Sequence, residues 1–372
     1  MRTNGAEVVL GFSPHYLEAV PSILSAMEKA DTIALEEPRT PGFSEMLLGD
    51  FSISEYLLQM DTDFPRFAAA LCEGLQILHA QGKHVLQVDP FLDRLVTIHE
   101  CFADNLTPEE VLSRPELRDI YLAEKQATGA LLRFYELSSG QDFRSIVDCV
   151  KQFAKLDAAR IRLRDELRAE AILSLVVPGQ KVYVEAGYMH FGILGMLQCR
   201  TSPRSTDRYA SARKREPDSL PTFKVQPKFI LQPITRRLHV RQRNMGPGDL
   251  LTLHFVFHPD MDHDRTDLLA ARSLIAIQLV TKEELIPAPN RYPQSEDDAT
   301  VNNLVHRLDY DQCRVLYERI RRAPRPTALR YTRQMVAGDR SLQFGPSRTP
   351  PGSNLSSQKH IGTQTEAREE LA

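Results

Sequence analysis

The chain has 372 residues, of which 42% are hydrophobic and 26% are charged, and its formal net charge is −3. These values are typical of a globular protein with a hydrophobic core. The nearly neutral charge disfavours bulk attraction to nucleic acid or to an anionic membrane. No run of 18 apolar residues occurs and the first residues lack the apolar core of a signal peptide, so we expect neither a transmembrane helix nor a secretory signal.

The cysteines indicate a reducing compartment. Five are present, an odd number, and they form no Cys-x-x-Cys pair: Cys72, Cys101, Cys149, Cys199 and Cys313. Free thiols in this pattern are typical of an intracellular protein rather than of a disulfide framework or a thiolate zinc site. We therefore expect a cytoplasmic protein.

Four short apolar runs, each bounded by turn or charge signals, predict buried parallel strands. They are Glu7–Gly11, Thr32–Leu35, His84–Val88 and Lys181–Val184. A helix is expected from Pro14 to Ala30, after Ser13 as its N-cap. Another is expected from Phe64 to Gln81, ending at Gly82. Alternating strands and helices predict an α/β fold with a mostly parallel central sheet flanked by helices.

A long helical insertion is expected from Phe91 to about Val177, within a first domain of residues 1–200. Residues 201–224, rich in Ser, Pro and Arg, predict a linker or mobile loop. Residues 225–323 predict a smaller α+β region, with strands at Phe229–Leu231, Leu238–Arg241 and Leu250–Phe257, another apolar run at Ser273–Val280 and a helix at Asp311–Arg321. Residues 324–372 predict a disordered tail.

The four predicted strands end in polar residues, which makes their carboxyl ends the expected place for a site. In open α/β sheets, ligands bind beyond these ends, where loops and helix N-termini converge. His15, Glu36, Asp89 and His190 follow the first, second, third and fourth strand, and Glu37 and Glu185 are close to them in sequence. Imidazole and carboxylate groups suit a divalent metal such as zinc or manganese, or a general base acting on water.

Each of these residues also has a structural interpretation. Asp89 before Pro90 is most simply a helix N-cap. Glu36 or Glu37 is explained by a solvated strand end, and His15 by an exposed loop. His190 has the stronger functional case, because Gly187 and Gly192 flank it and allow a tight turn and a close ligand.

The motifs resemble a superfamily that joins erythromycin-esterase-like hydrolases, ChaN-type haem-binding proteins and TraB/Tiki proteins. The resemblance covers about residues 6–200 and rests on GFSPH at Gly11–His15, LEEP at Leu35–Pro38, LRDELRAEAI at Leu163–Ile172 and VYVEAGYMHFG at Val182–Gly192. The last block, with its Gly-x-x-His spacing, is the most specific part.

The resemblance implies a hydrolase of ester or amide bonds that activates water through a bound metal or a His/Glu base. It implies catalytic roles for His15, Glu36, His190 and Arg164, with His15, Glu36 and His190 as the ligands of any metal and Glu37 as the substitute for Glu36. Arg164 would brace or bind an anionic group.

The first motif departs from the esterase pattern, because Phe12 and Ser13 stand where those members have a glutamate. A His/Glu dyad would need Glu36 or Glu185 instead, whereas the Tiki-like pattern does not need that glutamate. Haem ligation is a second hypothesis, with Tyr188, and also Tyr16, as phenolate ligands. A third hypothesis is a degenerate, non-catalytic interaction module.

Two other clusters have simpler explanations. His254, His258 and His263 lie near several aspartates, but a strand that leaves the core into a polar loop explains them equally well. Six arginines between Arg319 and Arg333 predict a solvated basic segment rather than a nucleic-acid site. No P-loop, dinucleotide fingerprint or serine-hydrolase elbow occurs, which disfavours those enzyme classes.

Overall fold

The computed structural model describes residues 5–60, 62–138, 140, 142–201, 223–239 and 245–338. The chain divides into two compact units, which we describe separately. Unit 1 takes its residues from Met1–Val96, Ile161–His239 and Glu283–Gln294, and unit 2 from Thr97–Arg160, Val240–Lys282 and Ser295–Ala372. No helix among the described residues is both long and apolar enough to cross a membrane.

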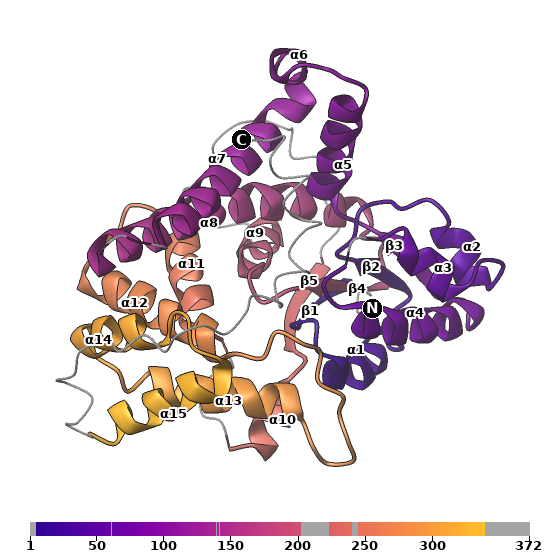
Figure 1. The fold of residues 1–372 in the computed structure, drawn as a ribbon. Helices are drawn as coiled ribbons and strands as arrows, with labels where there is room; N and C mark the ends of the chain where they lie inside the picture. Colours follow the sequence, from indigo (N-terminus) through magenta and orange to yellow (C-terminus); the bar gives the residue numbers. More distant parts are fainter. Residues whose placement is uncertain are drawn as a thin grey trace. The chain divides into compact units, whose positions relative to one another are not determined.

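Unit 1 is built on a parallel sheet of five strands (Figure 1). The strands are β1 (Ala6–Phe12), β2 (Thr32–Leu35), β3 (His84–Gln87), β4 (Lys181–Ala186) and β5 (Phe223–Phe229). Their order is β3-β2-β4-β1-β5, and every pairing is parallel. The four strands that the sequence predicts are therefore confirmed, as is the α/β fold with its flanking helices.

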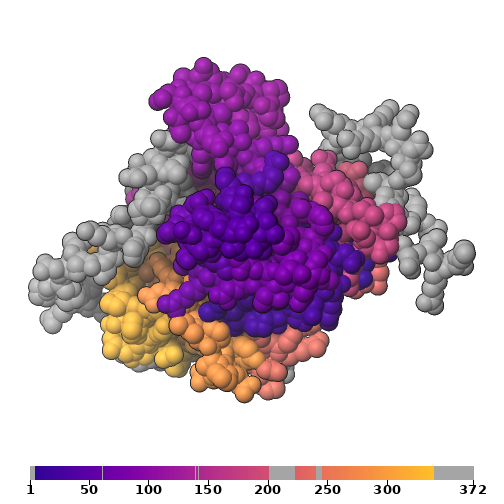
Figure 2. All heavy atoms as spheres, turned by 90° about the vertical axis from the view of Figure 1, so that its right-hand side faces the viewer, coloured from indigo at the N-terminus to yellow at the C-terminus, as the bar shows by residue number. Residues whose placement is uncertain are grey.

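Helices cover both faces of this sheet, because alternate residues of each strand point to opposite sides. Val8, Leu10 and Val184 belong to one hydrophobic cluster. Val9 and Tyr183 belong to the other. The first cluster includes residues of α8 (Phe143–Ser174) and α9 (Phe191–Thr201), and the second packs against α1 (Val20–Met27), α2 (Phe43–Leu48), α3 (Ile53–Leu58), α4 (Pro65–Ala80) and α10 (Gln232–Arg237). In the space-filling view, the indigo residues at the start of the chain, which belong to unit 1, are exposed toward the viewer (Figure 2).

Gly11 of β1 leaves room for a large side chain of the neighbouring strand. A Cβ atom on Gly11 would lie 2.0 Å from the hydroxyl oxygen of Tyr183, on the neighbouring β4. Only a residue without a side chain leaves room for the tyrosine ring at this position.

Unit 2 is helical in its described residues. Helix α5 (Pro90–Ala103) passes from unit 1 into unit 2. Unit 1 also contains a short 3-10 helix, Leu17–Ala19. The remaining helices are α6 (Pro108–Leu112), α7 (Pro115–Ser138), α11 (Pro247–Phe257), α12 (Asp264–Leu279), α13 (Pro293–Val305), α14 (Tyr310–Ile320) and α15 (Arg325–Val336). Helix α12 packs against α11, α14 and α15 around buried Leu274, Leu316 and Ala328.

The division into units differs from the predicted domain boundary at residue 200. The long helical insertion is present as α5 to α8, but most of it belongs to unit 2, and α8 continues into unit 1. The α+β region predicted for 225–323 contributes one strand, β5, which pairs with β1 of the main sheet. Most of the predicted linker, residues 202–222, lies outside the described residues.

Three predictions for the C-terminal part were wrong. Leu250–Phe257, predicted as a strand, forms part of helix α11, because a continuous apolar run suits a buried helix as well as a strand. The apolar run Ser273–Val280 lies mostly in helix α12. The strand predicted at Phe229–Leu231 is wrong, because β5 ends at Phe229 and Ile230 and Leu231 form a turn. Leu238–Arg241 lies partly outside the described residues. Part of the predicted tail is helix α15, which buries Ala328, Thr332 and Met335; residues 339–372 lie outside the described residues.

Candidate functional site

The sheet brings the polar strand ends of unit 1 to one edge. Strands β3, β2, β4 and β1 are consecutive neighbours, so their carboxyl ends lie in a row. Asp89, Glu36, His190 and His15 follow these four strands in that order. Helix α8 adds Arg164, Asp165 and Arg168 from its unit 1 part, and Arg168, which follows them by four and three residues, lies beside both on the helix surface.

His190 is held between two carboxylates. Its Nδ1 lies 2.5 Å from Oδ1 of Asp165, and its Nε2 lies 2.8 Å from Oε1 of Glu36. The three side chains are 5%, 0% and 8% exposed, respectively. Because both ring nitrogens have a carboxylate partner, the imidazole is fixed in position and the charged form of the ring is favoured.

Glu36 is the centre of this arrangement. Arg164 Nη2 lies 3.0 Å from its Oε1, and Arg168 Nη1 lies 3.3 Å from its Oε2. The backbone N–H of Gly187 donates a 2.6 Å hydrogen bond to Oε2. A buried carboxylate is stable only with such partners, and Glu36 has them on both oxygens.

Asp89 has two roles. Its Oδ1 accepts a 3.1 Å hydrogen bond from the N–H of Leu92, which confirms the predicted N-cap of α5. Its Oδ2 accepts a 2.8 Å hydrogen bond from Nε of Arg164 and lies 3.6 Å from Nε of Arg168. Asp89 is fully buried and thus also belongs to the charged site. We call Glu36, Asp89, Arg164, Asp165, Arg168 and His190 the strand-end cluster.

Backbone contacts anchor Arg168 within the cluster. Its Nη2 donates a 2.8 Å hydrogen bond to the carbonyl oxygen of Glu185, and its Nε donates a 3.2 Å bond to that of Val88. The side chain is fully buried. Arg168 therefore ties the ends of β3 and β4 to helix α8.

Gly192 allows Asp165 to approach the start of helix α9. A Cβ atom at Gly192 would lie 2.4 Å from Oδ2 of Asp165. This carboxylate oxygen is buried and has no hydrogen-bond partner among the described residues. The glycine that the sequence singles out next to His190 is thus required by the carboxylate that holds His190.

The charges of the strand-end cluster shift the pKa values of its members. Burial acts to raise the pKa of Glu36, but His190, Arg168 and Arg164 hold it well below its ordinary value. Burial acts to lower the pKa of His190, but Glu36 and Asp165 raise it overall. Burial raises the pKa of Asp165 against the attraction of His190 and Arg168. We infer an imidazolium at His190 and a carboxylate at Glu36 at neutral pH.

His15 lies near this cluster; part of its side chain is exposed to solvent, while neighbouring side chains partly desolvate its ring. Its ring packs against two aromatic rings, with centroid distances of 5.4 Å to Phe64 and 5.1 Å to Phe67. Desolvation of the ring lowers the pKa of His15, and this effect is larger than the opposing effect of Glu36 and Glu37, whose negative charges raise it. A neutral, accessible imidazole beside buried charges can accept a proton.

Two further glutamates lie beside the site. Burial raises the pKa of Glu185 to about 7, and repulsion from Glu36 adds to this effect. Burial likewise raises the pKa of Glu37 to about 7, with a contribution from Glu185. Glu185 accepts a 3.2 Å hydrogen bond from the N–H of Glu36, and Glu37 accepts a 3.1 Å bond from Gln87.

The predicted metal ligands do not fit a metal ion as they are arranged. Both nitrogens of His190 and both oxygens of Glu36 already have protein partners. His15 makes ring contacts instead of joining them. Across the part of the chain that the structure describes, no group of three or more His, Cys, Asp or Glu side chains could hold a metal ion. Zinc or manganese binding stays a prediction.

Tyr188, the predicted haem ligand, is partly buried and packs against both hydrophobic clusters of unit 1. These contacts give it a packing role. Haem binding through Tyr188 stays a prediction.

The histidines of unit 2 are arranged differently from the prediction. His254 lies on helix α11, and His258 caps its C-terminus. The rings of His258 and His263 lie 5.5 Å and 5.1 Å from that of His254, but Nε2 of His254 is hydrogen-bonded to the carbonyl oxygen of Met261. Helix geometry, rather than strand alternation, therefore brings His254 and His258 to one side.

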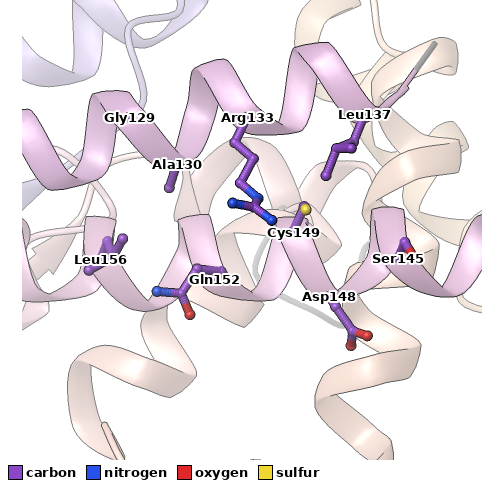
Figure 3. A pocket seen from close by; sticks show the side chains of 9 residues that line it. All are labelled: Gly129, Ala130, Arg133, Leu137, Ser145, Asp148, Cys149, Gln152 and Leu156. Atoms are coloured by element: carbon purple, nitrogen blue, oxygen red, sulfur yellow. The ribbon is translucent and has the colours of Figure 1, made fainter. Parts of the chain in front are cut away.

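Unit 2 also contains a groove of about 690 Å³ between helices α7 and α8 (Figure 3). Arg133 and Cys149 point toward one another across it, and Gln152 lies beside them. The other lining residues are Gly129, Ala130, Leu137, Ser145, Asp148 and Leu156. The groove is open and contains no paired histidine and carboxylate.

Sequence reasoning did not include Asp165 or Arg168 among the site residues. Two signals were available: the Arg-Asp pair within LRDELRAEAI, and the spacing of four residues between Arg164 and Arg168. The sequence places Asp89 among the strand-end residues but favours a helix cap as its role, because its burial and its arginine partners depend on a helix 75 residues later.

The chain is similar to one protein of undescribed function. It is 27% identical over 304 residues to an uncharacterised protein of Archaeoglobus fulgidus, and the similarity covers 82% of this chain and 95% of that protein. No family model matches the chain, and no solved structure matches it.

Proposed function

We propose that this protein hydrolyses an ester or amide bond and that His15 is its general base. The observation that carries the proposal is the strand-end cluster itself: a buried His190 fixed between Asp165 and Glu36, with an accessible His15 nearby. Buried charges with shifted pKa values at the carboxyl edge of a parallel sheet are typical of active sites.

In the proposed reaction, a water molecule gives one proton to His15 while its oxygen attacks the carbonyl carbon of the substrate. A neutral imidazole is required for this step, and desolvation lowers the pKa of His15 in the direction that keeps it neutral. The negative charges of Glu36 and Glu37 then stabilise the imidazolium that forms.

Arg164 is the group best suited to stabilise the oxyanion of the tetrahedral intermediate. Its side chain is 20% exposed, whereas that of Arg168 is fully buried, so Arg164 can meet a substrate. Its position is fixed by Asp89 and Glu36. When the intermediate collapses, the leaving group departs with the proton held by His15, which restores the neutral base.

The remaining members of the strand-end cluster hold this arrangement in place. His190 and Arg168 compensate the charge of Glu36, which orients Arg164. These residues are positioning residues, because the structure gives them no exposed surface for a substrate. The substrate is a small molecule or a peptide, and we expect the reaction to occur in the cytoplasm.

The test is a screen of acyl esters and peptide amides with purified protein, in the presence and absence of a chelator. We expect turnover that the chelator does not reduce, and a loss of about 100-fold or more in His15→Gln. Arg133→Ala, in the unit 2 groove, is the control and should keep full activity. Full activity in His15→Gln would contradict the role of the base, and a complete loss with chelator would favour the metal-dependent alternative.

A further inference from the structure

Helix α4 of unit 1 begins without a side-chain cap of its own. Its N-cap residue, Phe64, makes no capping hydrogen bond, although the helix runs for 16 residues from Pro65. The first N–H groups of a helix need acceptors from elsewhere. The residues that supply these acceptors therefore stabilise this end of the helix.

Glu284 supplies the missing cap from a distant part of the chain. Its Oε2 accepts a 2.9 Å hydrogen bond from the N–H of Arg66, and its Oε1 accepts a 2.8 Å bond from the N–H of Phe67. A carboxylate at a helix N-terminus also interacts favourably with the helix dipole. One side chain thus fixes two successive amides of α4.

The segment that carries Glu284 is attached to unit 1 at other points as well. The N–H of Gln294 donates a 3.2 Å hydrogen bond to Glu18. Arg237 donates a hydrogen bond to the hydroxyl of Tyr292, and its guanidinium carbon lies 5.9 Å from the centre of that ring. Residues 283–294 accordingly belong to unit 1, although the chain on either side belongs to unit 2. We call residues 283–294 the strap.

The capped end of α4 is also the end that contacts His15. The ring of Phe67, whose amide Glu284 binds, lies 5.1 Å from the ring of His15 and is tilted by 33°. The ring of Phe64 meets His15 edge-on at 5.4 Å. Phe67 is closely packed, so a movement of the first turn of α4 would carry its ring along.

We infer that Glu284 is a positioning residue for His15, acting through the first turn of helix α4 and the rings of Phe67 and Phe64. Its importance for catalysis rests on the proposed function; its effect on the position of His15 does not. Without the carboxylate, the amides of Arg66 and Phe67 lose their acceptors and the first turn loosens. The aromatic surface against His15 then loosens with it.

The test compares full-length Glu284→Ala with Glu283→Ala by NMR of the histidine ring protons. Glu283 is adjacent, exposed and equally charged, so it controls for the loss of a negative charge. Nearby aromatic rings shift the His15 signals, and in Glu284→Ala we expect these signals to move toward those of an unpacked histidine. Glu284→Gln keeps one acceptor oxygen and should give an intermediate shift.

Unchanged His15 signals in Glu284→Ala would overturn the inference, as would an equal change in Glu283→Ala. If Glu284→Ala does not fold, the Glu284→Gln spectrum decides in the same way. Where hydrolysis is measurable, we expect kcat to fall about tenfold with KM little changed, because the base is misplaced and not removed. Shifted His15 signals in a protein without hydrolytic activity would contradict the proposed function while supporting the role of Glu284.

Discussion

The strand-end cluster of unit 1 and the groove of unit 2 are two very different polar regions. In the cluster, Asp89, Asp165 and Arg168 are fully buried, and each charge faces an opposite one. The groove is open, and the exposed residues Arg133 and Asp148 line it. Burying charges is costly, so a fold keeps a buried network only where its members compensate one another. Concavity alone is therefore a weaker sign of a site than paired, buried, titratable groups.

The largest expected effect comes from removing one buried charge. Arg168→Ala leaves Glu36 and Asp89 with less compensation and removes two backbone hydrogen bonds. We expect the free energy of unfolding to fall by about 3–5 kcal/mol, measured by urea denaturation. Arg133→Ala in the groove should cost about 1 kcal/mol or less. Equal losses of unfolding free energy in Arg168→Ala and Arg133→Ala would contradict the difference between the strand-end cluster and the groove.

The next largest loss of stability is expected from a steric clash. Gly192→Ala places a Cβ atom 2.4 Å from Asp165 and must displace the carboxylate that holds His190. We expect a loss of about 1–3 kcal/mol in thermal or urea unfolding. Gly195→Ala in the same helix, and Gly129→Ala in the groove, meet no atom within 4 Å. Both controls should be stabilised by about 0.5–1 kcal/mol through helix propensity, and a neutral Gly192→Ala would contradict the close approach.

A smaller effect is expected in the pH dependence of stability. The pKa of Glu185 is about 7 in the folded protein and its ordinary value is 4.5. Between these values the folded state binds more protons than the unfolded state, so stability falls as pH rises from about 5 to 7. Glu185→Gln removes this contribution and keeps an acceptor for the N–H of Glu36. Urea unfolding at pH 5 and pH 8 should therefore show a smaller difference in Glu185→Gln than in the parent protein.

The smallest effect is expected in the groove itself. Cys149→Ser changes one atom of an open, partly exposed wall. We expect a change in unfolding free energy within about 0.5 kcal/mol, and hydrolysis at the parent rate. A large loss of activity in Cys149→Ser would move the site from unit 1 to unit 2.

Much of unit 1 could be predicted from the sequence, because its strands are short apolar runs bounded by charges and turns. The boundaries of β2 match the prediction, and the neighbouring strands differ by one or two residues. Unit 2 was harder to predict. The run at Leu250–Phe257 is apolar almost throughout, which suits a strand as well as a helix. The hydrogen bond from the N–H of Gly246 to Asp249 caps a helix there.

The sequence could predict only those site residues that directly follow the strands of the sheet. His190 and Glu36 follow neighbouring strands, so their meeting follows from the topology. Asp165 could not be assigned in this way, because its partner lies 25 residues later and the contact depends on how α8 crosses the sheet. The packing of His15 against Phe64 and Phe67, and the cap from Glu284, likewise arise from tertiary contacts.

The most direct test is the protonation state of two histidines at pH 7, read from side-chain ¹⁵N NMR of the full-length protein. His15→Gln and His190→Gln assign the signals. We predict a doubly protonated ring at His190, because Glu36 and Asp165 raise its pKa, and a neutral ring at His15, because desolvation lowers its pKa. A neutral His190 beside a protonated His15 would contradict both the charge network and the assignment of His15 as the base.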